Sequence, residues 1–400
     1  MSGGGARGAY EAGVLSYLFE ELSPQLDRPI HFDIVTGTSV GAIHACWVAA
    51  SQDDPSGGAR LTATWRSLSL EHVFPVGPAE VVRVPWRLLG LRPVSEWMPA
   101  RAERAPERLP GLFDSRWIES TVLNGIPWET LRRNIDEGRL YALAVAATEI
   151  ATGRSVVFVD TALGETPRWA GDPFVIARDA RIGPTHALAS ASIPLIFPAV
   201  RVDGAYCYDG GLRLNTPLAP ALRLGADRVL VIGLRYQRTP GEEDRLATQR
   251  LANYSSVTYL AGKALNALLL DRVEYDVGQL RLFNAILQRG FEVYGPEFLV
   301  RINEPIKEMR NTPYRIVDNV FIRPSQDIGA IAAECIGHQR SRGLSDWLSR
   351  NVARYAARGT TGEADLLSYL LFDQCYIGHL IELGRHDAEQ ASDELAKFFS

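Results

Sequence analysis

A serine between two glycines is the first residue of this chain whose surroundings could do chemistry. Ser39 is the centre of the pentapeptide Gly37-Thr38-Ser39-Val40-Gly41. In serine hydrolases, a G-x-S-x-G sequence forms a sharp strand-to-helix turn that presents the hydroxyl, and its glycines keep side chains away from the neighbouring strand and helix. Apolar residues on both sides favour such a strand and helix here. We therefore interpret Ser39 as a nucleophile rather than as part of a simple glycine-rich turn.

A glycine-rich loop lies at the start of the chain, and a helical hydrophobic pattern follows it. In such a loop, backbone N–H groups at a helix N-terminus can bind the oxyanion of an acyl transfer. The spacing also fits the G-x-G-x-x-G motif of dinucleotide-binding proteins, which needs a strand directly before it and a suitably placed acidic residue. Because only two residues precede the loop and no acidic residue is so placed, we favour an oxyanion hole. Its residues are Gly3, Gly4, Gly5, Ala6, Arg7 and Gly8.

An aspartate followed by two glycines is a candidate base. Asp209-Gly210-Gly211 follows the strand-like run Tyr206-Cys207-Tyr208, and Gly210 allows close approach to another loop. On its own, an Asp-Gly pair is more often a simple turn. Next to a reactive serine, however, the carboxylate could accept the hydroxyl proton as a general base.

A Ser/His/Asp triad is the alternative to a Ser/Asp dyad, and the position of the serine in the chain distinguishes them. The order Ser39, Asp209 and a later histidine (His338, His379 or His386) is compatible with the triad of α/β-hydrolases. That fold builds several strands before its nucleophile, whereas residues 1–38 have room for only one or two. We therefore predict a Ser39/Asp209 dyad and do not favour a role for His44, which follows the serine by five positions.

The composition is that of an ordinary globular protein. Of the 400 residues, 46% are hydrophobic and 22% charged, and the net charge of −5 makes a nucleic-acid partner unexpected. The four cysteines, Cys46, Cys207, Cys335 and Cys375, lack C-x-x-C spacing, so we predict neither a zinc site nor a disulfide framework. The proposed chemistry needs no metal or other cofactor. Without a membrane-spanning apolar run or a signal peptide, we expect a cytoplasmic protein whose membrane contact, if any, is peripheral.

The hydrophobic pattern predicts an α/β domain followed by a mainly helical region. Strands that alternate with helices favour a largely parallel sheet in the first part. A polar stretch at residues 235–244 then marks a boundary, so we predict an α/β part over residues 1–235 and a mainly helical part over residues 236–400 packed on it. The predicted strands are 30–35, 140–147, 155–159 and 228–234, and the predicted helices are 9–22, 40–50, 254–277, 279–288, 327–348 and 366–383.

In this order, the three motifs resemble those of the patatin-like phospholipases, which are serine lipid acyl hydrolases with a Ser/Asp dyad. The resemblance rests on the glycine loop with Arg7, the pentapeptide around Ser39 and the Asp209 motif. Residues 189–194 and Phe197-Pro198 are similar to the family's usual approach to the aspartate. Residues 366–370 and 384–388 are similar to the helical tails of bacterial members. The catalytic part of the resemblance covers about residues 1–235.

The resemblance implies a fold, a set of roles and a class of substrate. The fold would be a three-layer patatin-like α/β sandwich with a mostly parallel central sheet, plus a mainly helical C-terminal region. Ser39 would be the nucleophile and Asp209 its base, with Arg7 orienting the oxyanion loop rather than binding a phosphate head group. The substrates would be lipid or phospholipid acyl esters. A non-catalytic lipid-binding or interaction protein of the same fold is the alternative, and a nucleotide-binding oxidoreductase is less favoured.

Two further features lead to expectations of their own. Family members enter the glycine loop from a buried β-strand, so we expect that the native chain starts upstream of Met1 or that its first strand is missing here, which an intact-mass measurement would test. Residues 81–101 interleave arginines with tryptophans and leucines, as in an interfacial patch that meets anionic lipid. We favour the simpler interpretation, an insertion packed on the core with its arginines in solvent.

Overall fold

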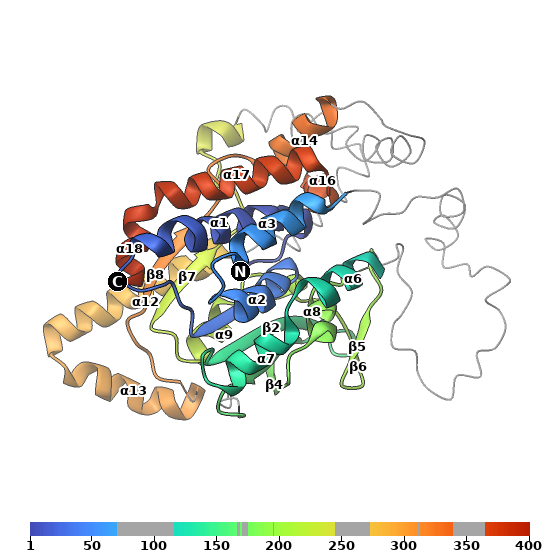
Figure 1. Cartoon of the computed structure of the whole chain (residues 1–400). Coiled ribbons are helices and arrows are strands. Elements are labelled where there is room, and N and C mark those ends of the chain that lie inside the picture. The colour runs from blue at the N-terminus through green and yellow to red at the C-terminus, as the bar shows by residue number, and fades with distance from the viewer. Residues whose placement is uncertain are drawn as a thin grey trace.

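A central β-sheet with helices on both faces organises the chain (Figure 1). The computed structural model describes residues 1–69, 116–165, 169, 175–194, 196–244, 273–310, 312–338 and 365–400. The strands are β1 (Ile34–Thr38), β2 (Ala142–Glu149), β3 (Ser155–Thr161), β4 (Val175–Asp179), β5 (Val200–Val202), β6 (Ala205–Asp209), β7 (Arg228–Ile232) and β8 (Asp318–Ile322).

The helices of the described residues belong to two groups by position in the chain. The first group is α1 (Gly8–Tyr17), α2 (Val40–Ser51), α3 (Gly57–Ser67), α6 (Arg116–Gly125), α7 (Trp128–Asp136), α8 (Pro184–Ser190) and α9 (Leu218–Arg223). The second group is α12 (Val273–Tyr294), α13 (Glu297–Arg310), α14 (Ile328–His338), α16 (Asp365–Leu370), α17 (Gln374–Gln390) and α18 (Ser392–Phe399). Short 3₁₀ turns, η1 (Gly5–Arg7) and η5 (Gly210–Leu212), lie in two of the predicted motifs.

The central sheet is mixed, so the prediction of a mostly parallel sheet is wrong. Its six strands run in the order β4-β3-β2-β6-β5, with β1 also paired to β2. Only the β1–β2 and β3–β4 pairs are parallel, whereas β2–β3, β2–β6 and β5–β6 are antiparallel. Short connections account for the antiparallel pairs β2–β3 and β5–β6, because a few residues can join only antiparallel neighbours. Asp203 and Gly204, both with positive φ, form such a two-residue hairpin turn between β5 and β6.

The sheet buries both of its faces. Along β2, Leu143 and Val145 belong to the main hydrophobic core, while the alternate residues Ala142, Ala144 and Ala146 belong to a smaller core on the other face. This alternation follows from the two-residue period of a strand. Helix α2 packs on β1 and β2, and α9 also packs on β1. The sheet therefore lies between helical layers.

The C-terminal helices pack directly on the N-terminal ones. Helix α17 lies along α1 and also contacts α3 and α14 (Figure 1). The approach is close, because side-chain atoms at Gly13 and Gly384 would overlap backbone atoms of α17 and α1 respectively. A parallel pair of strands, β7 and β8, also joins residues 228–232 to residues 318–322. The predicted division of the chain at residue 235 stays a prediction.

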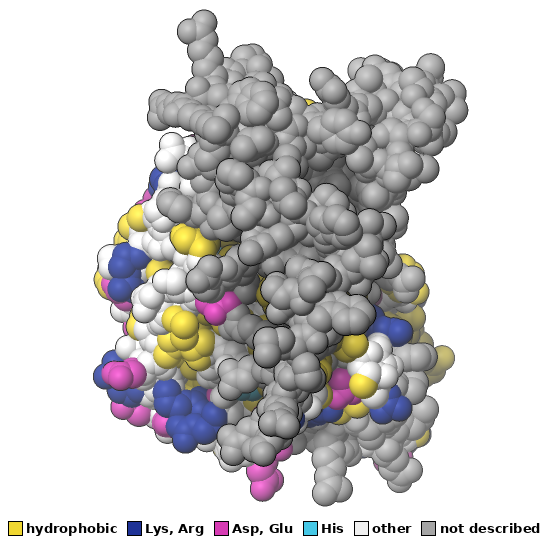
Figure 2. Space-filling model, turned by 90° about the vertical axis from the view of Figure 1, so that its right-hand side faces the viewer, with side chains coloured by type: hydrophobic (Ala, Val, Ile, Leu, Met, Phe, Trp, Pro, Cys, Tyr) yellow, Lys and Arg dark blue, Asp and Glu magenta, His cyan; other side chains and the backbone are white. Residues whose placement is uncertain are grey.

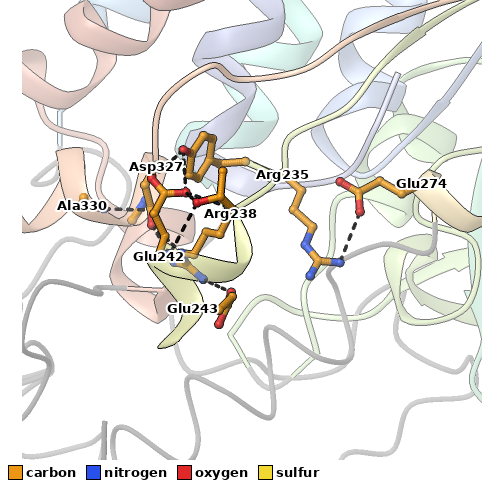
Figure 3. Close-up of polar contacts among 10 residues, drawn as sticks. Arg235, Arg238, Glu242, Glu243, Glu274, Asp327 and Ala330 are labelled. Atoms are coloured by element: carbon orange, nitrogen blue, oxygen red, sulfur yellow. Dashed lines mark hydrogen bonds and ion pairs between the residues drawn. The ribbon is translucent and has the colours of Figure 1, made fainter. Parts of the chain in front are cut away.

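One ionic cluster fixes the segment after β7 to the start of α14 (Figure 3). The Arg238 guanidinium donates two hydrogen bonds to Oδ2 of Asp327, at 3.0 and 2.6 Å. The other carboxylate oxygen of Asp327 accepts from the backbone N–H groups of Gly329 and Ala330. Asp327 thus caps the helix as well as pairing with the arginine.

A disulfide joins α14 to α17, although the cysteine spacing predicts none. It links Cys335 to Cys375, and Nδ1 of His379 lies 3.5 Å from the Cys335 sulfur. The same three residues are the only group with metal-ligand spacing among the residues that the structure describes. Cys46 and Cys207 are free and buried.

The structure interrupts one further predicted helix, and another predicted segment lies outside the residues that it describes. The predicted helix over 366–383 is interrupted between α16 and α17, because the Asp373 side chain accepts from the Cys375 N–H and starts a new helix. The arginine- and tryptophan-rich residues 81–101 lie outside the described residues. No helix in the described ranges is long and apolar enough to cross a membrane.

The first two residues are tied to the strands around them. The Met1 amino group donates to the Thr36 carbonyl of β1, at 3.0 Å. The Ser2 hydroxyl donates to the Ile232 carbonyl at the end of β7, at 2.7 Å. The glycine loop therefore begins between β1 and β7.

Candidate active site

Two strands end against the same edge of β2, and their ends carry the predicted dyad. Strand β1 is parallel to β2 and ends with Thr38 opposite Ala146. Strand β6 is antiparallel to β2 and ends with Asp209 opposite Ala147. Because Ala146 and Ala147 are neighbours in β2, the two strand ends meet, and Ser39, the residue after β1, is placed beside Asp209.

Ser39 occupies a strained turn between β1 and α2. Its φ of 57° is rare for a residue with a side chain. The glycines of the pentapeptide make this turn possible: a Cβ at Gly37 would overlap the carbonyl group of Gly41, and a Cβ at Gly41 would lie 2.6 Å from the Met1 carbonyl oxygen. The Ser39 N–H donates to the hydroxyl of Ser190, at 2.8 Å. The geometry is that of the predicted nucleophile elbow.

Ser39 and Asp209 form a short, buried hydrogen bond. The serine hydroxyl donates to Oδ2 of Asp209 at 2.5 Å, and Oδ1 of Asp209 accepts from the Gly211 N–H at 2.7 Å. Both residues are buried. Burial raises the pKa of Asp209 to about 7, against the opposing effect of these two hydrogen bonds. Gly210 is required here, because a side chain would overlap the Ala146 carbonyl.

The glycine loop lies directly against Ser39. A Cβ at Gly3 would lie 2.9 Å from the Ser39 Cβ, and one at Gly8 would lie 2.7 Å from the Val40 side chain. Gly5 has a φ of +55°, and a side chain there would overlap the Tyr369 carbonyl oxygen. Asn215 holds the start of the loop, since its carbonyl accepts from the Gly3 N–H and its amide donates to the Gly3 carbonyl, both at 3.2 Å.

Arg7 fixes the loop to the C-terminal region. The side chain is buried, and its Nε donates to the Ser368 hydroxyl at 2.8 Å. The guanidinium carbon lies 4.1 Å from the centre of the Tyr369 ring, which is a cation–π distance. Ala6, between Gly5 and Arg7, is fully buried. This arrangement agrees with a loop-orienting arginine rather than a head-group ligand.

An apolar cavity of about 100 Å³ opens beside Ser39. Its walls come from segments that are far apart in the sequence: α2, α3, α6, residues 191–197 and residues 369–372. The aromatic residues among its lining are Trp47, Trp65, Trp117, Phe197, Tyr369 and Phe372. Such a lining suits a hydrocarbon chain attached to the group that meets Ser39.

A larger cavity, of about 1220 Å³, lies beside the residues that follow Asp209. Its lining includes Gly211 and Asn215 together with charged residues such as Glu149 and Arg213, but not Ser39. Of these two cavities, the smaller is the one that Ser39 lines.

Among the histidines whose side chains the structure describes, which do not include His338, none bonds to Ser39 or Asp209. His44 Nδ1 pairs with Glu11 at 2.8 Å, and its Nε2 accepts from Trp65 at 2.9 Å. His379 lies by the disulfide and His386 is exposed. The described partner of the Ser39 hydroxyl is Asp209.

Several residues of this site escape the sequence motifs. Ser190 bridges the Ser39 N–H and the Ala146 carbonyl, and Asn215 holds Gly3. Glu11, His44 and Trp65 form a buried chain of hydrogen bonds. A signal existed for Ser190, which stands in the Ala189–Pro194 run before the aspartate, but none for the cavity-lining aromatics.

The described part of one face of the molecule carries charges of both signs (Figure 2). On the side shown in Figure 2, basic and acidic side chains lie close together, and hydrophobic side chains are visible in several places between them. This mixture gives no support to a nucleic-acid interface on the described part of that face.

A comparison with protein families agrees with the motifs. A family model described as "Patatin-like phospholipase" matches residues 1–222. The crystal structure of VipD from Legionella pneumophila is similar at 14% sequence identity and a TM-score of 0.30, over 95% of this chain and 66% of that one. No curated protein matches significantly. Since the family model covers more than half of the chain, including the serine turn, the glycine loop and the aspartate, the protein belongs to the patatin-like phospholipases, a family of lipid acyl hydrolases.

Proposed function

We propose that this protein hydrolyses carboxylic esters of lipids, in the manner of a phospholipase A, lysophospholipase or esterase, through a Ser39/Asp209 dyad. The observation that carries the proposal is the buried 2.5 Å hydrogen bond from the Ser39 hydroxyl to Asp209, next to an apolar cavity. A serine on a strained turn with a base in hydrogen-bond contact has the arrangement that nucleophilic catalysis requires.

The proposed reaction is an acyl transfer in two steps. Asp209 takes the proton from Ser39, and the Oγ attacks the ester carbonyl to form an acyl-enzyme and release the alcohol. Water then attacks the acyl-enzyme, with Asp209 again acting as base, and the fatty acid leaves. The pKa of about 7 suits this role, because a base whose pKa lies near the working pH both accepts and returns a proton readily.

The glycine loop supplies the proposed oxyanion hole. The Gly3 N–H donates to Asn215 and the Arg7 N–H donates to Gly4, so these two amides are engaged within the site. We therefore assign the developing negative charge to the N–H groups of Gly4 and Gly5. The first turn of η1 and α1 directly follows and adds a favourable helix-dipole field.

The glycine loop favours this function over the alternatives. A dinucleotide pyrophosphate needs an open glycine loop, whereas Gly3 and Gly5 here are in close approach to Ser39 and Tyr369. A non-catalytic lipid-binding protein would have no need of a strained serine turn with a short hydrogen bond to a buried carboxylate. The second candidate is therefore kept only as an outcome of the experiment.

Hydrolysis of a short acyl nitrophenyl ester tests the proposal. We expect Ser39→Ala and Asp209→Asn to lower kcat by at least ~10³-fold. Ser192→Ala is the matched control, since the hydroxyl of this buried serine donates to its own helical turn at Leu188 and its loss should leave the rate within about threefold. Fatty-acid release from phosphatidylcholine, lysophospholipid and triacylglycerol would then identify the lipid class. Equal rates for the wild type and both dyad variants would overturn the proposal.

A further inference from the structure

Three buried polar side chains outside the dyad connect the cavity to the glycine loop. Glu11 of α1, His44 of α2 and Trp65 of α3 are 0%, 1% and 5% exposed. Trp65 and His44 both line the apolar cavity, and Trp65 stacks on Phe372 with the rings 7° from parallel. Polar groups buried to this extent must satisfy one another, so their hydrogen bonds are strongly constrained.

The hydrogen bonds among these three side chains determine which ring nitrogen of His44 carries the proton. An indole N–H can only donate, so the Trp65 Nε1 that lies 2.9 Å from His44 Nε2 requires an unprotonated Nε2. The imidazole proton is then on Nδ1, which donates to Oε2 of Glu11 at 2.8 Å. His44 is consequently neutral and in its Nδ1–H form.

Glu11 connects this series of hydrogen bonds to the residue before the glycine loop. Its second oxygen, Oε1, accepts from the Ser2 N–H at 2.6 Å. Ser2 also bonds through its hydroxyl to Thr216 and Ile232, and the next residue, Gly3, lies against Ser39. Both Glu11 oxygens therefore accept N–H bonds, one from His44 and one from the start of the oxyanion loop.

We propose that Glu11 and His44 are positioning residues of the oxyanion hole. Hydrogen bonds converge on Glu11 from two sides, from Trp65 through His44 and from the Ser2 N–H, and they hold the start of the glycine loop in register with Ser39. The proposal rests on the proposed hydrolase function. His44 would then differ from a triad base. The hydrogen bonds of its ring go to Glu11 and Trp65 rather than to Ser39 or Asp209, so it acts through Glu11.

The direction of the hydrogen bonds allows a test that a purely steric role would fail. In Glu11→Gln, the new side chain would offer one oxygen and one NH₂ group where two N–H donors now arrive. In either orientation of the amide, its NH₂ group would face another donor, either the Ser2 N–H or the His44 Nδ1–H. If His44 changed to its Nε2–H form to avoid this, its Nε2–H would face the Trp65 N–H instead. Replacing Trp65 by phenylalanine removes that last donor. His44 could then take the Nε2–H form, accept from the glutamine amide and leave the glutamine oxygen for Ser2.

The kinetic experiment measures kcat and KM for Glu11→Gln, Trp65→Phe and the double variant with a nitrophenyl ester. We expect Glu11→Gln to lower kcat by about 10- to 100-fold with little change in KM, as one buried unpaired donor implies. The double variant should recover at least about fivefold over Glu11→Gln, although a second substitution usually adds to the loss. A double variant no faster than Glu11→Gln, or a wild-type kcat in Glu11→Gln, would overturn the proposal.

Two further measurements keep the proposal testable if Glu11→Gln does not fold or if the protein has no esterase activity. Nitrogen-15 NMR of imidazole-labelled full-length protein should show His44 in the neutral Nδ1–H form, with the signal assigned by its loss in His44→Asn. The Nε2–H form or a charged ring would overturn it. His44→Asn retains a donor towards Glu11 whereas His44→Leu retains none, so His44→Leu should lose at least about fivefold more kcat than His44→Asn. Equal losses in both would also contradict the proposal. An inactive wild type with the Nδ1–H ring would refute the hydrolase function alone.

Discussion

The two walls around Ser39 are built on different principles. The polar wall consists of Asp209, Ser190 and Asn215, which come from the end of β6, the end of α8 and the segment after η5. Each of them holds a backbone group by a hydrogen bond. The apolar wall consists of Trp65, Trp117, Tyr369 and Phe372, which come from α3, α6, α16 and the connection between α16 and α17. The polar wall sets the geometry of the reacting atoms, while the apolar wall sets only the shape of a hydrocarbon site.

The two walls also contribute to the folding free energy in opposite directions. Asp209 is a carboxylate that burial holds at a raised pKa, so its ionised form costs folding free energy. The apolar wall contributes to the main core, through Trp65 and Phe372 among others, and so stabilises the fold. The site thus combines a stabilising wall with a residue kept at a cost for its chemistry.

The largest expected effect separates stability from activity at Asp209. Because the folded pKa is raised from 3.8 to about 7, wild-type stability relative to Asp209→Asn falls as the pH rises from about 4 to about 7 and is constant above. Three pKa units correspond to a change of at most about 4 kcal/mol in the stability difference between the two proteins, in the direction that favours the inactive variant as the pH rises to about 8. Denaturant unfolding at both ends of this pH range would measure the change. A stability difference that does not change with pH would contradict the raised pKa of Asp209.

The next effect concerns the place where the glycine loop meets the apolar wall. Gly5→Ala combines a φ of +55° with an overlap on the Tyr369 carbonyl, so we expect kcat to fall about 100-fold by displacement of an oxyanion donor. Gly138→Ala is the matched control, because this glycine also has a positive φ, +73°, but nothing within 4 Å. Comparable losses of kcat in the two variants would show that backbone strain, rather than the oxyanion loop, is responsible.

A third effect is the pH dependence of the reaction. Asp209 must be ionised to act as a base, so kcat/KM should fall tenfold per pH unit below about 7 and level off above. Rates measured between about pH 5 and about pH 9 with an uncharged ester would show the curve. A flat profile would contradict the assignment of Asp209 as base.

The smallest effect is on acyl-chain preference. Phe372→Leu opens space in the apolar wall, and we expect the kcat/KM ratio of longer to shorter esters to rise on the order of fivefold. Phe399→Leu is the control, since Phe399 packs near Phe32 and does not line the cavity. An unchanged ratio in Phe372→Leu would remove this residue from the acyl site.

The sequence predicts the glycines and the aspartate of the three motifs, but it does not predict the parts that Ser190 and Asn215 play in the polar wall. Gly37, Gly41 and Gly210 are needed because any side chain would meet backbone, and such local constraints leave short motifs. The structure brings the three predicted motifs together, and the serine bonds to the aspartate as expected.

The apolar wall and the sheet direction were harder to predict for physical reasons. Any large apolar residue can line a hydrocarbon site, so Trp117 and Phe372 carry no signature before the chain folds. The mixed sheet depends on short connections, of which Asp203-Gly204 was a readable hairpin signal. The role of Asp373 as a helix cap, which turns residues 369–372 over the site, likewise depends on a single side chain.

Covalent labelling with a fluorophosphonate, followed by peptide mapping, tests the central claim most directly. We predict a single adduct on Ser39 in the wild type and a labelling rate at least ~100-fold lower in Asp209→Asn, because the hydroxyl then lacks its base. No adduct on Ser39, or labelling of Asp209→Asn at the wild-type rate, would contradict the Ser39/Asp209 dyad.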